Sequence, residues 1–325
     1  MLAPRAFATF CAHGGRVAAA RALFGGDGWI DLSTGIAPWA WPAGTALPGL
    51  ARLPEPGEIQ ALEAAAAAAF GGVDPARVVA VPGTDLAIRL LAPLIGARSP
   101  ALRSGYAGHH AAWPEARSVD DISTENLTGR DLLVIASPAN PDGRLTDPAR
   151  LRALAENLTV VVDEAYADPA PGLAPHASDR LIVLRSFGKF YGLPGLRLGF
   201  VIAGPRVTAQ LRAMLGDWPV SSPAIAIGTA AYLDGAWRRA QHARIVREGA
   251  LLDALLARAS LPILGTAPLF RLIGCTDAHR LFETLARRAI LVRPFAGQPH
   301  RLRIGLPADA PARLRLANAL QEFRP

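Results

Sequence analysis

The sequence is very poor in lysine: Lys189 is the only lysine among 34 lysine and arginine residues. An amine can lose its proton, attack a carbonyl carbon and form an imine, whereas a guanidinium stays protonated and does neither. Lys189 follows an apolar run at 181–184 and a short turn that contains Ser186. This setting is typical of a lysine that binds an aldehyde. A solvated surface lysine is the alternative interpretation.

Cysteine is nearly absent as well, with only Cys11 and Cys275 in the chain. The two lie far apart and have neither metal-ligand spacing nor the pattern of a disulfide framework, so we expect no metal site and a reducing, cytoplasmic environment. No uncharged apolar stretch reaches about 18 residues, which excludes a membrane-spanning helix. The N-terminal region has no long apolar segment, so a signal peptide is not expected.

Charged residues make up only 19% of the chain, and apolar residues make up 51%. This composition excludes a disordered protein, and 325 residues can form one large domain with a smaller companion. The net charge is +7, but the arginines are dispersed among acidic residues and no basic run is interleaved with aromatics. We therefore expect no nucleic-acid partner, although the charge can attract anionic substrates.

Short apolar runs alternate with helical patterns over the first two thirds of the chain. The predicted strands are 78–81, 132–136, 158–162, 181–184 and 198–202. The predicted helices between them are 58–70, 85–95 and 148–156. Strands that are apolar throughout must be buried on both faces, so the pattern indicates an α/β fold with a mostly parallel sheet.

The pattern changes towards the C-terminus and predicts a smaller α+β unit. A long arginine-rich helical stretch at 222–258 comes first. Strands then follow at 269–273, 290–293 and 301–304, with helices at 277–288 and 309–323. We therefore expect a large domain over 46–220 and a small domain over 221–325, which an irregular N-terminal arm over 1–45 joins.

Polar residues follow each predicted strand of the large domain, where open α/β sheets bind their ligands. Gly83, Thr84 and Asp85 open a helix directly after the first strand. Free N–H groups at a helix start and the Thr84 hydroxyl suit a phosphate, although an ordinary helix cap is the alternative. Asn140 lies in a proline-rich segment after a later strand, and that segment alone indicates a turn.

Asp163 ends another buried strand, and Tyr166 follows three residues later. A buried acid costs desolvation energy unless it meets a cation, such as a protonated pyridine nitrogen, and a helix-capping aspartate is the alternative. Ser186 precedes Lys189, and Arg197 comes just before the next strand. Ser186 and Arg197 could therefore contact one phosphate.

These groups together match the needs of pyridoxal 5′-phosphate. This cofactor needs an amine for its aldehyde, a carboxylate for its ring nitrogen, donors to its ring oxygen and a polar site for its phosphate. Lys189 is the predicted catalytic residue and Asp163 the predicted partner of the ring nitrogen. The other predicted cofactor residues are Gly83, Thr84, Asp85, Asn140, Tyr166, Ser186 and Arg197.

Three segments resemble the class I/II aminotransferases, which have the aspartate-aminotransferase-like fold. They are Asn140-Pro141, Asp163-Glu164-Ala165-Tyr166, and Ser186-Phe187-Gly188-Lys189 with Arg197. The resemblance implies that Tyr106 stacks on the cofactor ring and that Arg303 binds the substrate carboxylate. It also implies a homodimer, because active sites in this family usually lie at a dimer interface.

The N-terminal third resembles one branch of this family, the cobalamin-pathway threonine-phosphate decarboxylases. The resemblance rests on His13-Gly14-Gly15-Arg16, Asp31-Leu32-Ser33-Thr34-Gly35-Ile36, Arg52-Leu53-Pro54-Glu55-Pro56 and Tyr106-Ala107-Gly108-His109. It implies a phosphorylated amino acid as substrate, with His13, Gly35 and Ile36 as candidates for the substrate phosphate and Asn140 as a further substrate contact. Leu53 stands where histidinol-phosphate aminotransferases have a tyrosine, and Ala37 stands where the family has asparagine.

The resemblance implies decarboxylation of L-threonine O-3-phosphate to (R)-1-amino-2-propanol O-2-phosphate in cobalamin biosynthesis. One alternative is an aminotransferase of the histidinol-phosphate type that acts on a phosphorylated or aromatic amino acid. Another is a non-catalytic binding or regulatory protein that keeps the fold. The sequence does not decide between these from first principles, because the reactions differ in which bond at the α-carbon is aligned with the cofactor ring.

Overall fold

The computed structural model describes residues 4–44, 49–103 and 105–323, which form two compact units. The larger unit comprises Ala40–Asn140 and Arg144–Arg239. The smaller unit comprises Met1–Trp39, Pro141–Gly143 and Ala240–Pro325. The domain limits at 45 and 220 expected from the sequence stay predictions.

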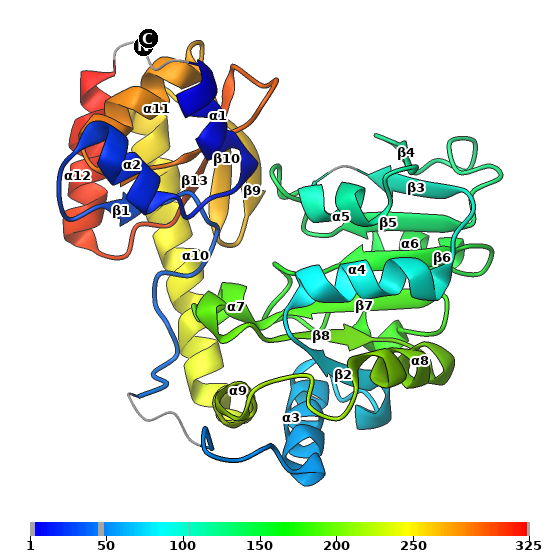
Figure 1. Cartoon of the computed structure of the whole chain (residues 1–325). Coiled ribbons are helices and arrows are strands. Elements are labelled where there is room, and N and C mark those ends of the chain that lie inside the picture. The colour runs from blue at the N-terminus through cyan, green and yellow to red at the C-terminus, as the bar shows by residue number, and fades with distance from the viewer. Residues whose placement is uncertain (1–3, 45–48, 104, 324–325) are drawn as a thin grey trace. The chain divides into compact units, whose positions relative to one another are not determined.

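A seven-stranded sheet forms the centre of the larger unit, with the strand order β2-β8-β7-β6-β5-β3-β4 (Figure 1). The strands are β2 (Val78–Val81), β3 (Pro100–Arg103), β4 (Arg117–Ser118), β5 (Leu132–Ala136), β6 (Thr159–Asp163), β7 (Leu181–Ser186) and β8 (Gly199–Ile202). All neighbours pair in parallel except β8, which is antiparallel to both β2 and β7. The predicted α/β fold with a mostly parallel sheet is confirmed.

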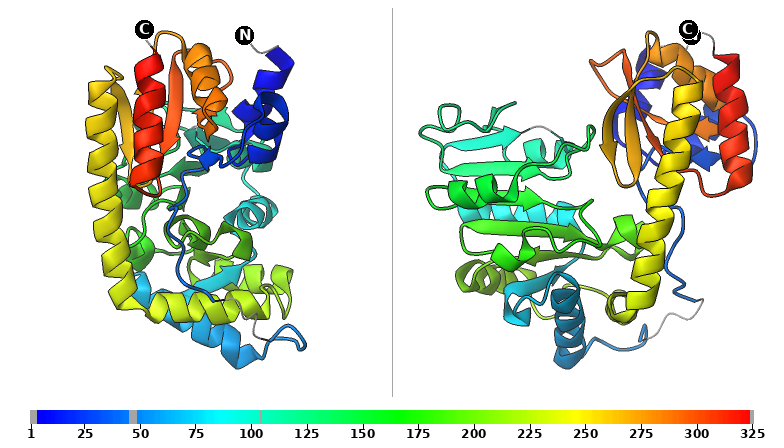
Figure 2. Two further views of the ribbon diagram at one scale, coloured as in Figure 1. Left: turned by 90° about the vertical axis from the view of Figure 1, so that its left-hand side faces the viewer. Right: turned by 180° about the vertical axis from the view of Figure 1, so that it is seen from behind.

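The sheet strands are apolar because helices cover them. α4 (Thr84–Ile95), α5 (Ala107–Ala112) and α8 (Pro205–Leu215) share one apolar core with β2, β5 and β7, in which Ile88, Leu91 and Leu211 are fully buried. Figure 1 shows α4 and α8 in front of the sheet, and the right-hand view of Figure 2 shows the sheet from behind. Burial of this kind is the main favourable contribution to folding.

Several of the remaining helices of the larger unit begin at side-chain caps. The remaining helices are α3 (Pro56–Ala69), α6 (Pro148–Leu154), α7 (Phe187–Phe190) and α9 (Ser222–Leu233), with 3₁₀ turns η1 (Pro75–Arg77), η2 (Ala174–His176) and η3 (Pro194–Leu196). The side chains of Asp147 and Ser221 accept hydrogen bonds from backbone N–H groups of the first turns of α6 and α9. Such caps pair N–H groups that the helix itself leaves without a partner.

The smaller unit is an α+β unit, as predicted. It has a four-stranded antiparallel sheet in the order β12-β13-β10-β9 and a parallel pair of β1 with β11. Its strands are β1 (Ile30–Asp31), β9 (Ile263–Ala267), β10 (Phe270–Gly274), β11 (Ile290–Leu291), β12 (Arg293–Pro294) and β13 (Arg301–Gly305). Its helices are α1 (Pro4–Ala12), α2 (Val17–Phe24), α11 (Ala278–Arg287) and α12 (Ala310–Glu322), and α10 (Gly235–Arg258) enters it at residue 240.

Three local predictions are wrong. The N-terminal arm is not irregular, since it contains α1 and α2. The helix expected over 222–258 is two helices, because α9 ends at Leu233. The carboxylate of the next residue, Asp234, accepts the N–H of Trp237 at 3.0 Å in the first turn of α10. The strand expected over 290–293 is divided into β11 and β12. Among the described residues, no helix has both the length and the apolar character that crossing a membrane requires.

Candidate active site

Asp163 is a fixed carboxylate at the carboxyl end of β6, and it is 7% exposed. Its Oδ2 lies 3.1 Å from Nε2 of His109, and its Oδ1 accepts the N–H of Ala165 at 3.0 Å. Its backbone oxygen accepts the N–H of Ser137 at 3.0 Å. These bonds hold a negative charge in place beneath the surface, where a cationic ring nitrogen would compensate its desolvation.

His109 is a site residue that the sequence interpretation missed. It lies in α5 and is 1% exposed, and its ring packs edge-on against the ring of Tyr106, with centroids 5.5 Å apart. Its Nδ1 has no hydrogen-bond partner among the described residues. The sequence signal for His109 was its position three residues after Tyr106, the predicted ring-stacking residue. The sequence interpretation used this segment only as part of the family resemblance.

Tyr106 is connected to the start of α4. Its hydroxyl donates a hydrogen bond to Oδ1 of Asp85 at 2.9 Å. Burial, together with this bond to Asp85, raises the pKa of Tyr106 to about 12, so the hydroxyl stays protonated. Residue 108 must be glycine, because a Cβ there would lie 2.3 Å from Cε1 of Tyr106. The side chain of Asp85 thus has two partners: the Tyr106 hydroxyl, and Nε of Arg89 at 3.3 Å.

Gly83, Thr84 and Arg197 meet at the start of α4. Gly83 is the N-cap of the helix with φ +86°, and as a glycine it supplies no side-chain cap. A Cβ at position 83 would lie 2.7 Å from Nη2 of Arg197, so the guanidinium lies close against this glycine, whose positive φ other residues rarely adopt. A Cβ at position 199 would lie 3.0 Å from the Thr84 nitrogen, so Gly199 also packs closely here. Backbone N–H groups at a helix start and a guanidinium are groups that can bind a phosphate.

Lys189 lies in α7, directly after β7. Its Nζ is 5.7 Å from the centre of the Tyr166 ring, and Tyr166 is 8% exposed. Ser186 begins α7 and pairs with Gly199 across β7 and β8. Lys189 therefore lies near Tyr166. Ser186 ends β7, and the neighbouring strand β8 begins two residues after Arg197.

Asn140 follows β5 and lies against the segment that carries Tyr106. A Cβ at position 105 would be 2.8 Å from the backbone oxygen of Asn140, which requires glycine there. Asn140 and Tyr106 therefore occupy adjoining segments of the larger unit. All the cofactor residues predicted from the sequence belong to this unit.

A buried ion cluster lies beside the ends of β6 and β7 and was also missed. Arg185 is fully buried, and it pairs with Glu164 at 2.9 Å and with Asp168 at 2.6 Å. It also donates to the backbone oxygens of Ala170 and Pro171. Burial raises the pKa of Glu164, although the charge of Arg185 opposes this shift. The cluster fixes the residues next to Asp163 and Ser186.

The other predicted substrate residues belong to the smaller unit. Arg303 lies on β13 and is 2% exposed, and its Nη2 donates to the backbone oxygen of Ser33 at 2.6 Å. Its guanidinium carbon is 4.7 Å from the centre of the Phe270 ring. His13 is exposed, Gly35 is buried and has φ +62°, and Ile36 is partly buried. Arg303 is thus fixed close to the segment that contains Gly35 and Ile36.

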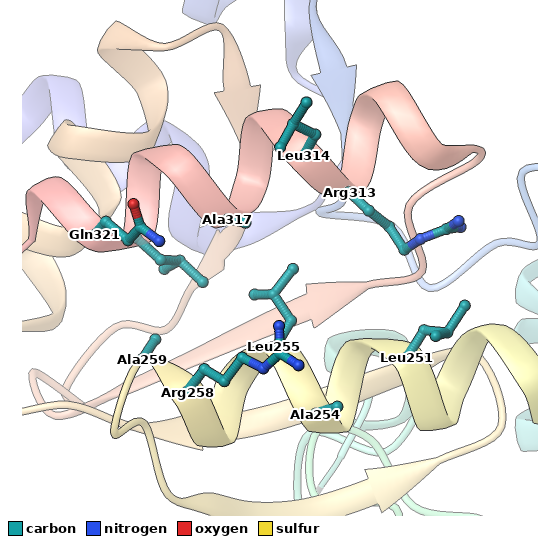
Figure 3. A pocket seen from close by; sticks show the side chains of 10 residues that line it. Leu251, Ala254, Leu255, Arg258, Ala259, Arg313, Leu314, Ala317 and Gln321 are labelled. Carbon is teal, nitrogen blue, oxygen red and sulfur yellow. The ribbon is translucent and has the colours of Figure 1, made fainter.

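A groove of about 330 Å³ lies between α10 and α12 in the smaller unit (Figure 3). It is lined by Leu251, Ala254, Leu255, Arg258, Ala259, Arg313, Leu314, Ala317, Leu320 and Gln321. It contains none of the predicted site residues. In the described ranges, no group of three His, Cys, Asp or Glu side chains could hold a metal ion.

The chain is similar in sequence to several known proteins. The family model "Aminotransferase class I and II" matches residues 116–319. A threonine-phosphate decarboxylase from Pseudomonas aeruginosa is 39% identical over 96% of this chain and 98% of its own length. Another from a Sinorhizobium species is 40% identical over 95% of this chain and 97% of its own.

A solved structure has a similar fold at lower sequence identity. It is a histidinol-phosphate aminotransferase from Sinorhizobium meliloti in complex with pyridoxal-5′-phosphate. It superimposes with a TM-score of 0.81 at 22% identity and covers 94% of this chain and 93% of its own. This likeness confirms the aspartate-aminotransferase-like fold.

Proposed function

Since this chain belongs to the class I and II aminotransferase family, we propose that it is a pyridoxal 5′-phosphate enzyme that decarboxylates L-threonine O-3-phosphate. The product is (R)-1-amino-2-propanol O-2-phosphate, and the pathway is cobalamin biosynthesis. The observation that carries the choice of reaction is the near-complete coverage of two relatives named threonine-phosphate decarboxylase. Leu53, in place of the tyrosine of histidinol-phosphate aminotransferases, supports the same choice.

The residues of the larger unit fit this cofactor. Gly83 and Thr84 offer an uncapped helix start next to the Arg197 guanidinium, which suits its phosphate together with Ser186. Asp163, held by His109, suits its ring nitrogen. Tyr106 would cover the ring, and Asn140 and Tyr166 would donate to the ring oxygen. When bound, the cofactor supplies an electron sink for the bond broken at the substrate α-carbon.

The chain's own groups would orient and protonate the substrate. Arg303 would hold the substrate carboxylate, because a guanidinium binds a carboxylate with two parallel hydrogen bonds. His13 and the backbone at Gly35 and Ile36 would bind the substrate phosphate. The Nζ of Lys189 would deliver a proton to the α-carbon after carbon dioxide leaves. A fixed Asp163 favours this reaction, because it stabilises positive charge on the ring while negative charge develops at the substrate.

The decisive experiment measures carbon dioxide release from threonine phosphate without any keto-acid acceptor. The proposal predicts steady release by the cofactor-loaded protein, with formation of aminopropanol phosphate. Plain threonine is the control, and it should react far more slowly because it lacks the phosphate. A strict requirement for a keto-acid acceptor would instead establish the second candidate, an aminotransferase.

We also propose a cytoplasmic homodimer. Leu50, Leu53, Met214 and Trp218 are exposed by 66%, 60%, 46% and 55% in the larger unit. The hydroxyl of Ser222 donates to the backbone oxygen of Arg52 at 3.4 Å, so the segment that carries Leu50 and Leu53 lies against the start of α9. Large apolar side chains exposed on a surface can mark a protein interface, and a second copy is the occupant we propose. The two free cysteines agree with a reducing compartment.

A further inference from the structure

We propose that Ser33 is a positioning residue that holds the substrate side of the site, an inference that rests on the proposed function. Ser33 is 2% exposed and lies just after β1, in the smaller unit. Its backbone oxygen accepts a hydrogen bond from Nη2 of Arg303 at 2.6 Å. Its side-chain oxygen accepts the N–H of Gly15 at 2.8 Å. One residue thus binds both the carboxylate arginine and the turn that follows His13.

The turn after His13 is shaped to fit Ser33. Gly15 has φ +80°, a conformation that favours glycine. A Cβ at position 14 would lie 2.4 Å from the backbone oxygen of Ser33, so a side chain there would push the turn away. Gly14 therefore allows a close approach of this turn to Ser33, and Gly15 allows the positive φ of the turn. Because Gly14 packs against the backbone of Ser33, the backbone position of the adjacent His13 is fixed as well.

Ser33 is itself held on two sides. Oδ1 of Asp31 accepts both the N–H of Ser33 at 2.8 Å and its hydroxyl at 2.5 Å. The backbone of Leu32 bonds to Leu291 at 2.8 Å and to Gly305 at 2.7 Å, which ties the segment to β11 and β13. The hydroxyl direction is therefore set by Asp31, and its lone pair faces Gly15. The arrangement sets the spacing between His13 and Arg303, and hence between the substrate phosphate and carboxylate.

The test compares Ser33→Ala with wild type in the cofactor-loaded protein. Loss of the hydroxyl should raise KM for threonine phosphate about tenfold and leave kcat within about twofold, because one hydrogen bond to the substrate-binding turn is lost. Asp31→Ala should act in the same direction, since it releases the hydroxyl of Ser33. Thr284→Ala is the matched control, because it removes a hydroxyl bonded to Arg280 in α11 of the same unit. It should leave KM unchanged.

A binding readout separates this proposal from the proposed function. Threonine phosphate should slow backbone hydrogen exchange over residues 11–20 in wild type and much less in Ser33→Ala. If wild type releases no carbon dioxide, the proposed function fails. The hydrogen-exchange comparison then tests the role of Ser33 by itself. Equal slowing in both proteins, no slowing in wild type, or a KM for Ser33→Ala that matches the Thr284→Ala control would overturn the proposal.

Discussion

Lys189 allows a direct chemical test, because it is the only lysine of the chain. Borohydride treatment of the cofactor-loaded protein should attach the cofactor to one peptide that contains residue 189, which mass spectrometry can identify. Lys189→Ala should lose this labelling, and its activity should fall by about a thousandfold or more, since the proton donor is removed. A labelled peptide that lacks residue 189 would contradict the assignment.

His109 should strengthen cofactor binding through Asp163. His109→Ala removes the partner of Asp163 Oδ2, so the carboxylate becomes less well fixed, and we expect cofactor affinity to fall about tenfold or more. Equilibrium dialysis with pyridoxal 5′-phosphate measures this affinity. His110→Ala is the control, because the neighbouring His110 is exposed. Equal dissociation constants for the two variants would count against the role of His109.

Tyr106 should stay protonated in mildly alkaline solution, because burial and Asp85 raise its pKa to about 12 from 10.0. Since the folded pKa is the higher one, Tyr106 contributes stability that is complete below pH 10 and is lost as the pH rises towards 12. The difference in phenolate absorbance between wild type and Tyr106→Phe should therefore still be small at pH 10. A half-developed difference at that pH would show an ordinary tyrosine.

Several candidate site residues lie at the ends of buried strands. Asp163 and Ser186 end β6 and β7, and Arg197 precedes β8, so an apolar run next to a polar residue was enough to make them candidates. His109 and Arg185 lacked such a signal. His109 lies in a six-residue helix without a clear pattern, and Arg185 is a charged residue inside a strand that is otherwise buried. Only three-dimensional packing shows what pairs with them.

At the scale of elements, the long apolar runs were predicted well and the short or interrupted elements were not. β2 and β5 have the bounds expected from the sequence, because continuous apolar runs of four or five residues leave little choice. β4 has two residues, both exposed, and β3 begins with a proline, so neither shows the pattern of a buried strand. The division between α9 and α10 depends on one capping contact of Asp234, which periodicity does not reveal.

The connection between β6 and β7 should depend strongly on Arg185. Arg185→Met would leave Glu164 and Asp168 buried without their cation, and we expect the free energy of unfolding to fall by about 3–5 kcal/mol. Denaturation in urea at neutral pH measures this loss. Because the cluster lies next to Asp163 and Ser186, the variant should also bind pyridoxal 5′-phosphate more weakly.

Two controls make the Arg185 test specific. Arg152→Ala removes an exposed arginine of α6 and should change the unfolding free energy by less than about 1 kcal/mol. The triple variant Arg185→Met, Glu164→Gln and Asp168→Asn removes the charges together, so it should recover part of the lost stability. If Arg185→Met alone is as stable as wild type, the ion cluster contributes little to the free energy of unfolding.

At the scale of the whole molecule, the exposed apolar residues of the larger unit should form the contact between two copies. Leu53→Glu with Trp218→Glu places charges on this surface, so the double variant should sediment as a monomer while wild type sediments as a dimer. Leu314→Glu is the matched control, because Leu314 is 62% exposed on α12 of the smaller unit, and it should leave the dimer intact. A monomeric wild type, or a double variant that stays dimeric through a dilution series, would place the interface elsewhere or exclude it.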